Sequence, residues 1–319
     1  MKTDPMRSDR GIVPPLVTPL TEKGRLDLVG LECLIEHVVA GGVHGLFILG
    51  TTGEGPSLCC EVRREMIRHT CRIARGRLPV YVGISDTAII ESVSLARFAA
   101  DAGCDFVVVT PPYYFPVGQV ELTAYFRQLL AELPLPTMLY NMPSVTGLSI
   151  DPETVRSLLD QEKVVGLKDS SGDLDYFKEI LKIASVREDF SVMVGPEHLL
   201  AQTLALGGDG GVAGGANIWP SIFVDLYEAS VSDESVDISP LNSYIVQLGE
   251  IYKVGPESIT ATIARTKMAL SICQICTETT APPILPTNSK ERERISQILV
   301  QLGRIPGQSH AGIPQSQIA

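Results

Sequence analysis

The sequence predicts an α/β protein, a (β/α)8 TIM barrel with a helical C-terminal extension. Short apolar runs alternate with amphipathic helical patterns through most of the chain, and this alternation is typical of βα units and a parallel sheet. The runs are almost continuously apolar, as expected for strands that are covered on both faces. Eight such units in about 215 residues match the size of a closed barrel.

Eight strands are expected, at residues 11–17, 44–50, 79–83, 105–110, 136–140, 164–168, 191–195 and 209–213. Amphipathic helical segments lie between them, for example 28–40 and 91–103. The stretches 38–50, 98–110 and 203–215 share one pattern, in which glycine ends a helix and an apolar strand follows within a few residues. Glycine readily takes the left-handed conformation that ends a helix, so each stretch indicates a helix-to-strand connection.

A doubly wound sheet is the alternative fold, but it usually has an early G-x-G-x-x-G between strand and helix, which this sequence lacks. After residue 220 the strand pattern stops. We expect a barrel core at 11–220 and a helical extension at 221–303, packed on the barrel or on a neighbouring subunit. The remaining segments, 1–10 and 304–319, are expected to be flexible tails.

Composition excludes several classes of partner. The 319 residues carry a net charge of −11 without a basic run, which argues against nucleic acid and anionic membranes as partners. No apolar stretch approaches the roughly 20 residues needed to span a bilayer. The N-terminus MKTDPMRSDRG lacks the apolar segment of a secretory signal. We therefore expect a cytoplasmic protein.

Cysteine and histidine do not indicate a metal site. Cys273 and Cys276 have the C-x-x-C spacing, but they lie within a helical pattern, so they are interpreted as small buried residues of a reducing compartment. The five histidines show no H-E-x-x-H pattern or other ligand spacing. No metal is expected.

Lys168 is the candidate nucleophile. Barrel enzymes place their reacting groups at the C-terminal ends of the strands, and Lys168 ends the apolar run VVGLK. Partial desolvation favours a neutral amine, which can form a Schiff base with a ketone and so assist cleavage or formation of an adjacent C–C bond. Lys178 and Lys182 are interpreted as solvated helix residues. The alternative is that Lys168 forms a salt bridge with Asp169 or Glu197.

Other strand ends carry hydroxyl groups. Thr51 and Thr52 lie in the turn GTTGEG, where hydroxyl and backbone N–H groups could clamp a carboxylate, although an ordinary turn with a Thr helix cap has the same sequence. Tyr140 ends another strand and could transfer protons beside a Schiff base. Tyr113 and Tyr114 could do the same, or pack at a subunit interface.

Together these motifs resemble a known family. GTTGE, TPPYY, YNMPSVTG and GLKDSSGD occur in the order and spacing of the dihydrodipicolinate synthase / N-acetylneuraminate lyase family, and GIVPPLVTPL and GGDGGVAGGAN fit it as well. The likeness runs from about residue 11 to residue 303. It implies a TIM barrel, usually a homotetramer built as a dimer of dimers, and a class I aldolase mechanism without a metal or organic cofactor.

The resemblance also implies roles for individual residues. Lys168 matches the Schiff-base lysine, and Tyr140 matches the tyrosine that transfers protons above it. Thr51 would link Tyr140 to Tyr114, which in this family reaches into the neighbouring subunit's active site. Thr52, with its turn, would hold the carboxylate of pyruvate.

Three further positions concern the substrate pocket. Gly195 and Val212 match positions that line the family's pocket with backbone. Members that make dihydrodipicolinate carry an arginine where this chain has Val145, and that arginine grips the second substrate's carboxylate. Valine cannot make this bidentate contact, and a carboxylate without its charged partner costs about 2–5 kcal/mol. Either another residue replaces it, or the second substrate differs, for example an aldehyde from a sugar acid.

The sequence therefore predicts a Schiff-base-forming, pyruvate-dependent lyase or aldolase that joins or cleaves pyruvate and an aldehyde. One alternative uses the same lysine in a 2-oxo-3-deoxy sugar acid aldolase or dehydratase. A second alternative is a barrel that binds ligands without catalysis.

Overall fold

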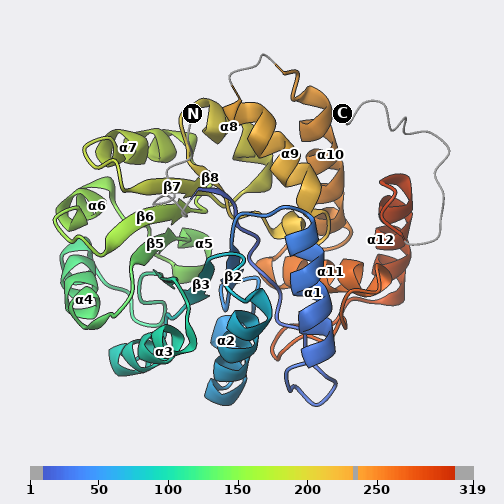
Figure 1. The fold of residues 1–319 in the computed structure, drawn as a ribbon, viewed down its shortest axis with the longest axis horizontal. Helices are drawn as coiled ribbons and strands as arrows, with labels where there is room; N and C mark the ends of the chain where they lie inside the picture. The colour runs from blue at the N-terminus through green and yellow to red at the C-terminus, as the bar shows by residue number, and fades with distance from the viewer. Residues whose placement is uncertain (1–9, 233–235, 306–319) are drawn as a thin grey trace.

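Eight parallel strands form the centre of the molecule. The computed structural model describes residues 10–232 and 236–305, and its strands pair in the order β1-β8-β7-β6-β5-β4-β3-β2. Figure 1 shows the strands at the centre with helices around them. The strands are β1 (Gly11–Ile12), β2 (Leu46–Ile48), β3 (Val80–Gly83), β4 (Phe106–Val109), β5 (Thr137–Asn141), β6 (Val164–Asp169), β7 (Ser191–Val194) and β8 (Gly210–Gly211).

The sheet closes on itself. β1 pairs with β8, and beyond β1 a parallel bridge between Pro15 and Phe47 joins the first segment to β2. The backbone N–H of Leu16 donates to the carbonyl of Phe47 at 2.8 Å. A closed parallel sheet of eight strands is the barrel that the sequence predicts, so this prediction is confirmed.

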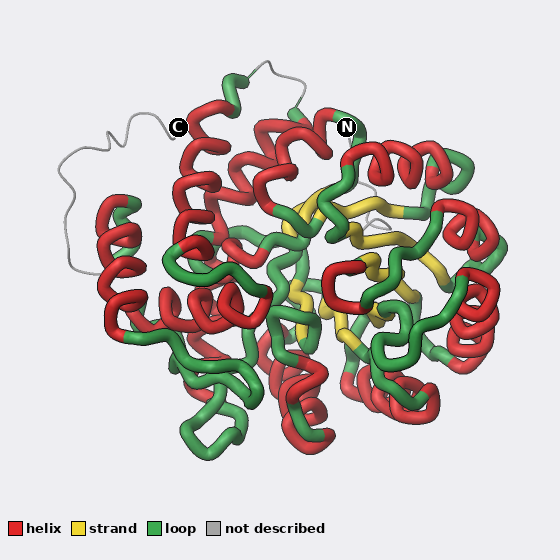
Figure 2. The backbone as a smooth tube through the Cα atoms, turned by 180° about the vertical axis from the view of Figure 1, so that it is seen from behind, coloured by secondary structure: helices red, strands yellow, loops and turns green. Residues whose placement is uncertain are grey.

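Helices form the outer ring, which Figure 2 shows from behind. Each covers the sheet with an apolar face; in α7, for example, Phe177, Ile180 and Ile183 are buried, and Asp173 caps the first turn. One helix of the ring follows each strand: α1 (Leu28–Ala40), α2 (Cys60–Ala74), α3 (Ile89–Ala102), α4 (Gln119–Glu132), α6 (Pro152–Leu158), α7 (Leu174–Ala184), α8 (Leu200–Ala205) and α9 (Pro220–Val231).

Six of the eight strands are shorter than predicted, and β1 and β8 are reduced to two residues each. The segment predicted as a strand at 11–17 pairs with β8 only at Gly11 and Ile12. Pro14 and Pro15 follow, and proline has no N–H with which to continue a ladder. β8 is limited to Gly210 and Gly211, and Gly210 has a φ of 158°.

The C-terminal extension lies on one side of the barrel (Figure 1) and contains α10 (Ser239–Gly249), α11 (Ile259–Ile272) and α12 (Ser289–Gln301). Because α9 packs on α8 and on β1, it completes the barrel's ring of helices. We therefore propose that the extension begins after α9 rather than at residue 221. The tails expected at 1–10 and 304–319 lie mostly outside the described residues. Within the described part of the chain, no helix is both long and apolar enough to cross a membrane.

Candidate active site

A cavity of about 850 Å³ opens where the strands end. One wall comes from the ends of β5 and β6 and from the loops after β2, β7 and β8; the opposite wall comes from the C-terminal extension. Six of the eight residues predicted from the sequence line it: Thr51, Thr52, Tyr140, Lys168, Gly195 and Val212. The structure thus brings together groups that are up to 161 positions apart in the chain, from Thr51 to Val212.

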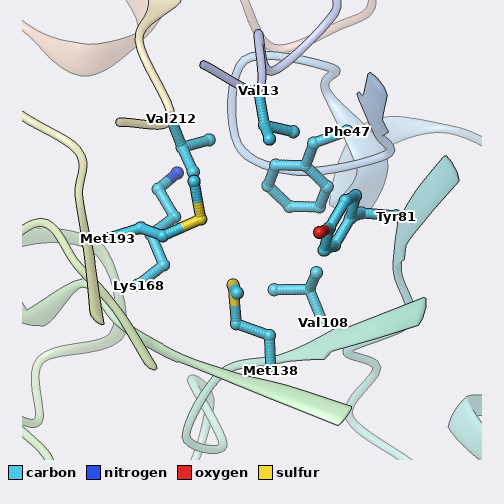
Figure 3. A pocket seen from close by; sticks show the side chains of 8 residues that line it. All are labelled: Val13, Phe47, Tyr81, Val108, Met138, Lys168, Met193 and Val212. Carbon is cyan, nitrogen blue, oxygen red and sulfur yellow. The ribbon is translucent and has the colours of Figure 1, made fainter. Parts of the chain in front are cut away.

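Lys168 lies between the barrel interior and this cavity, and its side chain is 4% exposed. Its Nζ is 4.0 Å from the centroid of the Tyr140 ring and 5.3 Å from that of Phe47. Figure 3 shows the side chain beside Met193 and Val212, among apolar groups that fill the barrel. No carboxylate among the described residues lies within ion-pair distance of this amine.

The two carboxylates considered as partners of Lys168 are bonded elsewhere. Asp169 accepts a hydrogen bond from the Asn141 amide at 2.8 Å and another from the Ser171 hydroxyl at 2.9 Å. It follows Lys168 in a strand, where successive side chains point to opposite faces. Glu197 is bonded to groups beyond β8, including the Gly215 N–H. The geometry therefore gives no support to a structural salt bridge at Lys168.

Tyr140 connects the lysine to the threonine turn. Its hydroxyl shares a hydrogen bond with Thr51 Oγ1 at 3.3 Å. Burial alone would raise the pKa of this phenol, but the charge of Lys168 and hydrogen bonds with Thr51, Lys168 and Ser170 outweigh it, and the pKa falls below its ordinary value. A phenol that gives up its proton more readily is suited to proton transfer beside an amine.

The turn that carries Thr51 and Thr52 is tightly packed. Leu49 and Glu54 both have positive φ, 58° and 59°. A Cβ on Gly55 would lie 2.1 Å from the Leu49 carbonyl oxygen, so only glycine fits there. The Thr18 hydroxyl also donates to the carbonyl of Gly53 at 2.6 Å. These contacts fix the direction in which the two threonines face the cavity.

A buried ion pair between Glu54 and Lys267 connects this turn to α11. The sequence analysis does not predict this pair. Both side chains have 0% exposure. Glu54 also accepts from the Ala281 N–H at 2.6 Å, and Lys267 donates to the Thr279 carbonyl at 2.6 Å. Burial lowers the pKa of Lys267, while Glu54 opposes that shift. The signal in the sequence was a lysine in the apolar pattern ARTKMAL.

Glu197 is a second cavity residue that the sequence analysis does not predict, since the sequence suggests it only as a salt-bridge partner of Lys168. It lines the large cavity, and its Oε1 accepts from the Gly215 N–H and from the Tyr252 hydroxyl, the latter at 3.2 Å. Burial raises the pKa of its carboxyl to about 7. Its Oε2 is buried and has no hydrogen-bond partner among the described residues.

Val145 lies in a smaller, neighbouring cavity of about 130 Å³. It is on the short helix α5 (Pro143–Thr146) and is 43% exposed. Thr51 and Tyr140 line both cavities, so the smaller one continues the larger one past the reacting groups. Its remaining lining is largely apolar near Val145 and contains no arginine.

Tyr114 is not brought to the site by this chain. It is 75% exposed and packs edge-on against Phe115, which is 73% exposed. Tyr113 instead lines the smaller cavity. A contact between Tyr114 and Thr51 of the same chain is therefore not part of this site.

Comparison with known proteins agrees with this geometry. The model of the dihydrodipicolinate synthetase family matches residues 8–302. A solved structure of dihydrodipicolinate synthase from Bacteroides thetaiotaomicron is 45% identical, with a TM-score of 0.88, and the match covers 94% of this chain and 99% of that one. The prophage protein YagE of Escherichia coli K12, crystallised with pyruvate, is 30% identical with a TM-score of 0.88, covering 93% and 99%.

A further relative is named for a different substrate. The Escherichia coli protein named "Probable 2-dehydro-3-deoxy-D-pentonate aldolase YjhH" is 32% identical over 304 residues, which cover 94% of this chain and 100% of that protein. The family match thus extends over the barrel and the extension alike, and it confirms the resemblance drawn from the motifs. The chain belongs to the dihydrodipicolinate synthase family.

Proposed function

We propose that this protein, a pyruvate-dependent lyase of the Schiff-base aldolase class, joins pyruvate to an uncharged, hydroxylated aldehyde or cleaves the corresponding 2-oxo-3-deoxy sugar acid. One observation carries the proposal: Lys168 is buried at a strand end without a carboxylate partner, beside a tyrosine hydroxyl. A buried amine in such a place is suited to nucleophilic attack.

The reaction begins with attack of the Lys168 amine on the 2-oxo carbon of the substrate. The carbinolamine loses water and leaves an imine, and Tyr140 moves the protons with Thr51 as its hydrogen-bond partner. Thr52 and the N–H groups of its turn hold the carboxylate of pyruvate. Loss of a proton from the methyl group gives an enamine, which adds to the aldehyde carbon; the reverse sequence cleaves the same bond.

The cavity lining favours a hydroxylated second substrate. Among the described residues that line the smaller cavity beside Val145 there is no cation to hold a second carboxylate, so an aldehyde that carries one would be poorly bound there. Glu197 lines the larger cavity, and hydroxyl groups of Tyr252, Ser258 and Thr262 line the same cavity from the C-terminal extension. Such groups suit hydroxyls of a sugar-derived chain. The name of the Escherichia coli pentonate aldolase supports this choice.

Dihydrodipicolinate synthesis is the second candidate, because the relative of known structure with 45% identity has that name. A dehydratase acting on a 2-oxo sugar acid through the same lysine is the third, and its product would be lighter by one water with no pyruvate released. A barrel that binds ligands without catalysis would show binding but no turnover.

We also propose a cytoplasmic homo-oligomer, arranged as a dimer of dimers. Tyr114 and Phe115 expose adjacent aromatic rings, and exposed aromatic pairs of this kind are typical of interfaces. In such an assembly Tyr114 would reach Thr51 of a neighbouring subunit and complete the route for protons. Size-exclusion chromatography with light scattering tests the assembly.

Trapping the imine tests the mechanism. The protein is incubated with pyruvate and borohydride, and its intact mass and peptide map are measured. We expect one reduced pyruvate adduct on Lys168, no adduct in Lys168→Ala, and an unchanged adduct in the control Lys178→Ala, whose amine is exposed beside Asp175. An adduct at another lysine, or none, would contradict the assignment of Lys168.

An aldehyde panel then tests the substrate. Pyruvate is supplied with uncharged hydroxylated aldehydes of two to four carbons or with an aldehyde that carries a carboxylate, and products are identified by mass. We expect condensation with the hydroxylated members. Faster condensation with the carboxylate-bearing aldehyde would favour dihydrodipicolinate synthesis and refute the sugar-acid assignment.

A further inference from the structure

Two cysteines that are distant in sequence face each other away from the active site. Cys71 lies in the last turn of α2, and Cys104 lies between the end of α3 and β4. Their Sγ atoms are 3.2 Å apart, and both thiols are free. A disulfide has an S–S length of about 2.05 Å, so closing the bond needs the sulfurs to approach by about 1.2 Å.

The backbone on both sides is well anchored, so this proximity is imposed by the fold. The carbonyl of Cys71 accepts from the Arg75 N–H at 3.1 Å, and the Cys104 N–H donates to the Ala99 carbonyl at 3.0 Å. Next to Cys104, Asp105 is held to Val80 by two hydrogen bonds, of 3.0 and 2.8 Å. The two sulfurs therefore meet in the folded state, although 33 positions separate them.

The two thiols differ in access and in acidity. Cys104 is 5% exposed, whereas Cys71 is partly open to solvent. The hydrogen bond from the Cys104 thiol lowers the pKa of the Cys71 thiol, and it raises the pKa of Cys104. Cys71 is thus the thiol that an oxidant can reach and the one that ionises first. Cys104 is buried next to it and is placed to react with the oxidised Cys71.

We propose that Cys71 and Cys104 are a reversible oxidation site at which a hydroperoxide forms a disulfide between α2 and the segment entering β4. The Cys71 thiolate attacks the O–O bond, becomes a sulfenic acid and releases the alcohol, or water from hydrogen peroxide. The Cys104 thiol then attacks the sulfenic sulfur, the S–S bond forms and one water leaves. Two thiols lose two electrons and two protons, and one hydroperoxide is reduced.

The pair singled out by C-x-x-C spacing is a weaker candidate. Cys273 is buried and its thiol donates to the Arg304 carbonyl at 3.4 Å, and burial raises the pKa values of Cys273 and Cys276 to about 11 and about 12. Neither is readily ionised. The C-x-x-C spacing does not indicate the Cys71–Cys104 pair, because a contact between residues 33 positions apart is not visible in the sequence.

The new bond would lie at the end of the barrel opposite the active site. Cys104 precedes β4, while the reacting groups follow the strands, and α2 runs back to the same end. A cross-link there constrains the unfolded chain without covering the cavity. Oxidation should therefore raise thermal stability and leave the reactivity of Lys168 unchanged.

The test counts thiols on the full chain. Protein is treated with one to ten equivalents of hydrogen peroxide, denatured and labelled with N-ethylmaleimide, and its mass and peptides are compared with those of reduced protein. The reduced chain should take seven labels, one per cysteine, and the oxidised chain about five, since a disulfide removes two. Tryptic peptides containing Cys71 and Cys104 should be linked, and dithiothreitol should restore all labels.

Two variants make the result specific. In Cys71→Ser the peroxide-dependent loss of two labels should vanish, whereas in Cys33→Ser, which removes an exposed cysteine on another helix, it should persist. The melting temperature of oxidised wild type should rise by several degrees, and that of Cys71→Ser should not. Unchanged labelling in wild type, a link between other cysteines, or sulfinic acid at Cys71 without a link would overturn the proposal.

Discussion

Two lysines are buried in the part of the chain that the structure describes, and they belong to different regions with different surroundings. Lys267, in the C-terminal extension, has 0% exposure and forms an ion pair with Glu54. Lys168, in the barrel, is 4% exposed and lies over the rings of Tyr140 and Phe47 without a carboxylate nearby. Both amines have lost most of their water, but only one has a compensating negative charge.

A buried lysine with a carboxylate partner and a buried lysine without one are suited to different roles. Glu54 opposes the lowering of the Lys267 pKa by burial, and the ion pair fixes the turn of Thr51 and Thr52 to the extension. No carboxylate among the described residues pairs with Lys168, whose amine lies over the rings of Tyr140 and Phe47 instead. The paired lysine is therefore assigned to structure and the unpaired one to chemistry. The same substitution at both positions separates these roles.

Lys168→Met should have the largest effect. Methionine keeps the unbranched stem but not the amine, so imine trapping with pyruvate should fall below detection and turnover should be lost. Because no ion pair is broken, the free energy of unfolding should change by less than about 1.5 kcal/mol. Borohydride trapping and urea denaturation measure the two quantities. Turnover near the wild-type rate in Lys168→Met would contradict the assignment of Lys168 to the chemical step.

Lys267→Met is the matched change, and its effect should appear in stability. It leaves Glu54 buried without a cation, which typically costs about 3–5 kcal/mol. Urea denaturation should show this loss, while protein that is still folded should retain the pyruvate adduct on Lys168. The double variant Lys267→Met/Glu54→Leu should recover part of the loss, because no charge remains buried. A single-variant cost below about 1 kcal/mol would contradict the structural assignment.

Tyr140→Phe tests whether the tyrosine hydroxyl transfers protons for Lys168. It keeps the ring under the amine and removes only the hydroxyl that bonds to Thr51. Loss of a positioned proton-transfer group lowers kcat by about 10²- to 10⁴-fold, whereas KM for pyruvate should change only a few-fold. Steady-state kinetics and the rate of imine trapping measure this split. A large rise in KM with unchanged kcat would show that the hydroxyl binds substrate instead.

The sequence predicts the barrel well because its signal is local and repeated. Apolar runs, helix-ending glycines and strand-end polar residues each lie within a few positions, and six of the eight predicted site residues do meet at one cavity. The Lys267 pair could not be predicted, since its partner is 213 positions away and any acidic residue could have served. Tyr114 shows another limit: the role proposed for it depends on a second chain, which leaves no trace in periodicity.

Removing the carboxyl group of Glu197 should have the smallest effect of these substitutions. Glu197 is a buried acid that can be compared with the two buried lysines. Like Lys168 it lines the cavity without an opposite charge, and burial raises its pKa from 4.5 to about 7. The folded state therefore binds this proton more tightly than the unfolded state does. The resulting stability is fully present below pH 4.5 and is lost as the pH rises through about 7.

Glu197→Gln removes this proton, so the variant should lack that pH dependence. Between pH 4.5 and 7.5 the unfolding free energy of wild type should fall relative to the variant by on the order of 1–3 kcal/mol, with partial solvent access reducing the full linkage value. Urea denaturation at both pH values measures it. Parallel stability curves of wild type and variant would mean that the Glu197 carboxyl is solvated in the cavity and that burial does not raise its pKa.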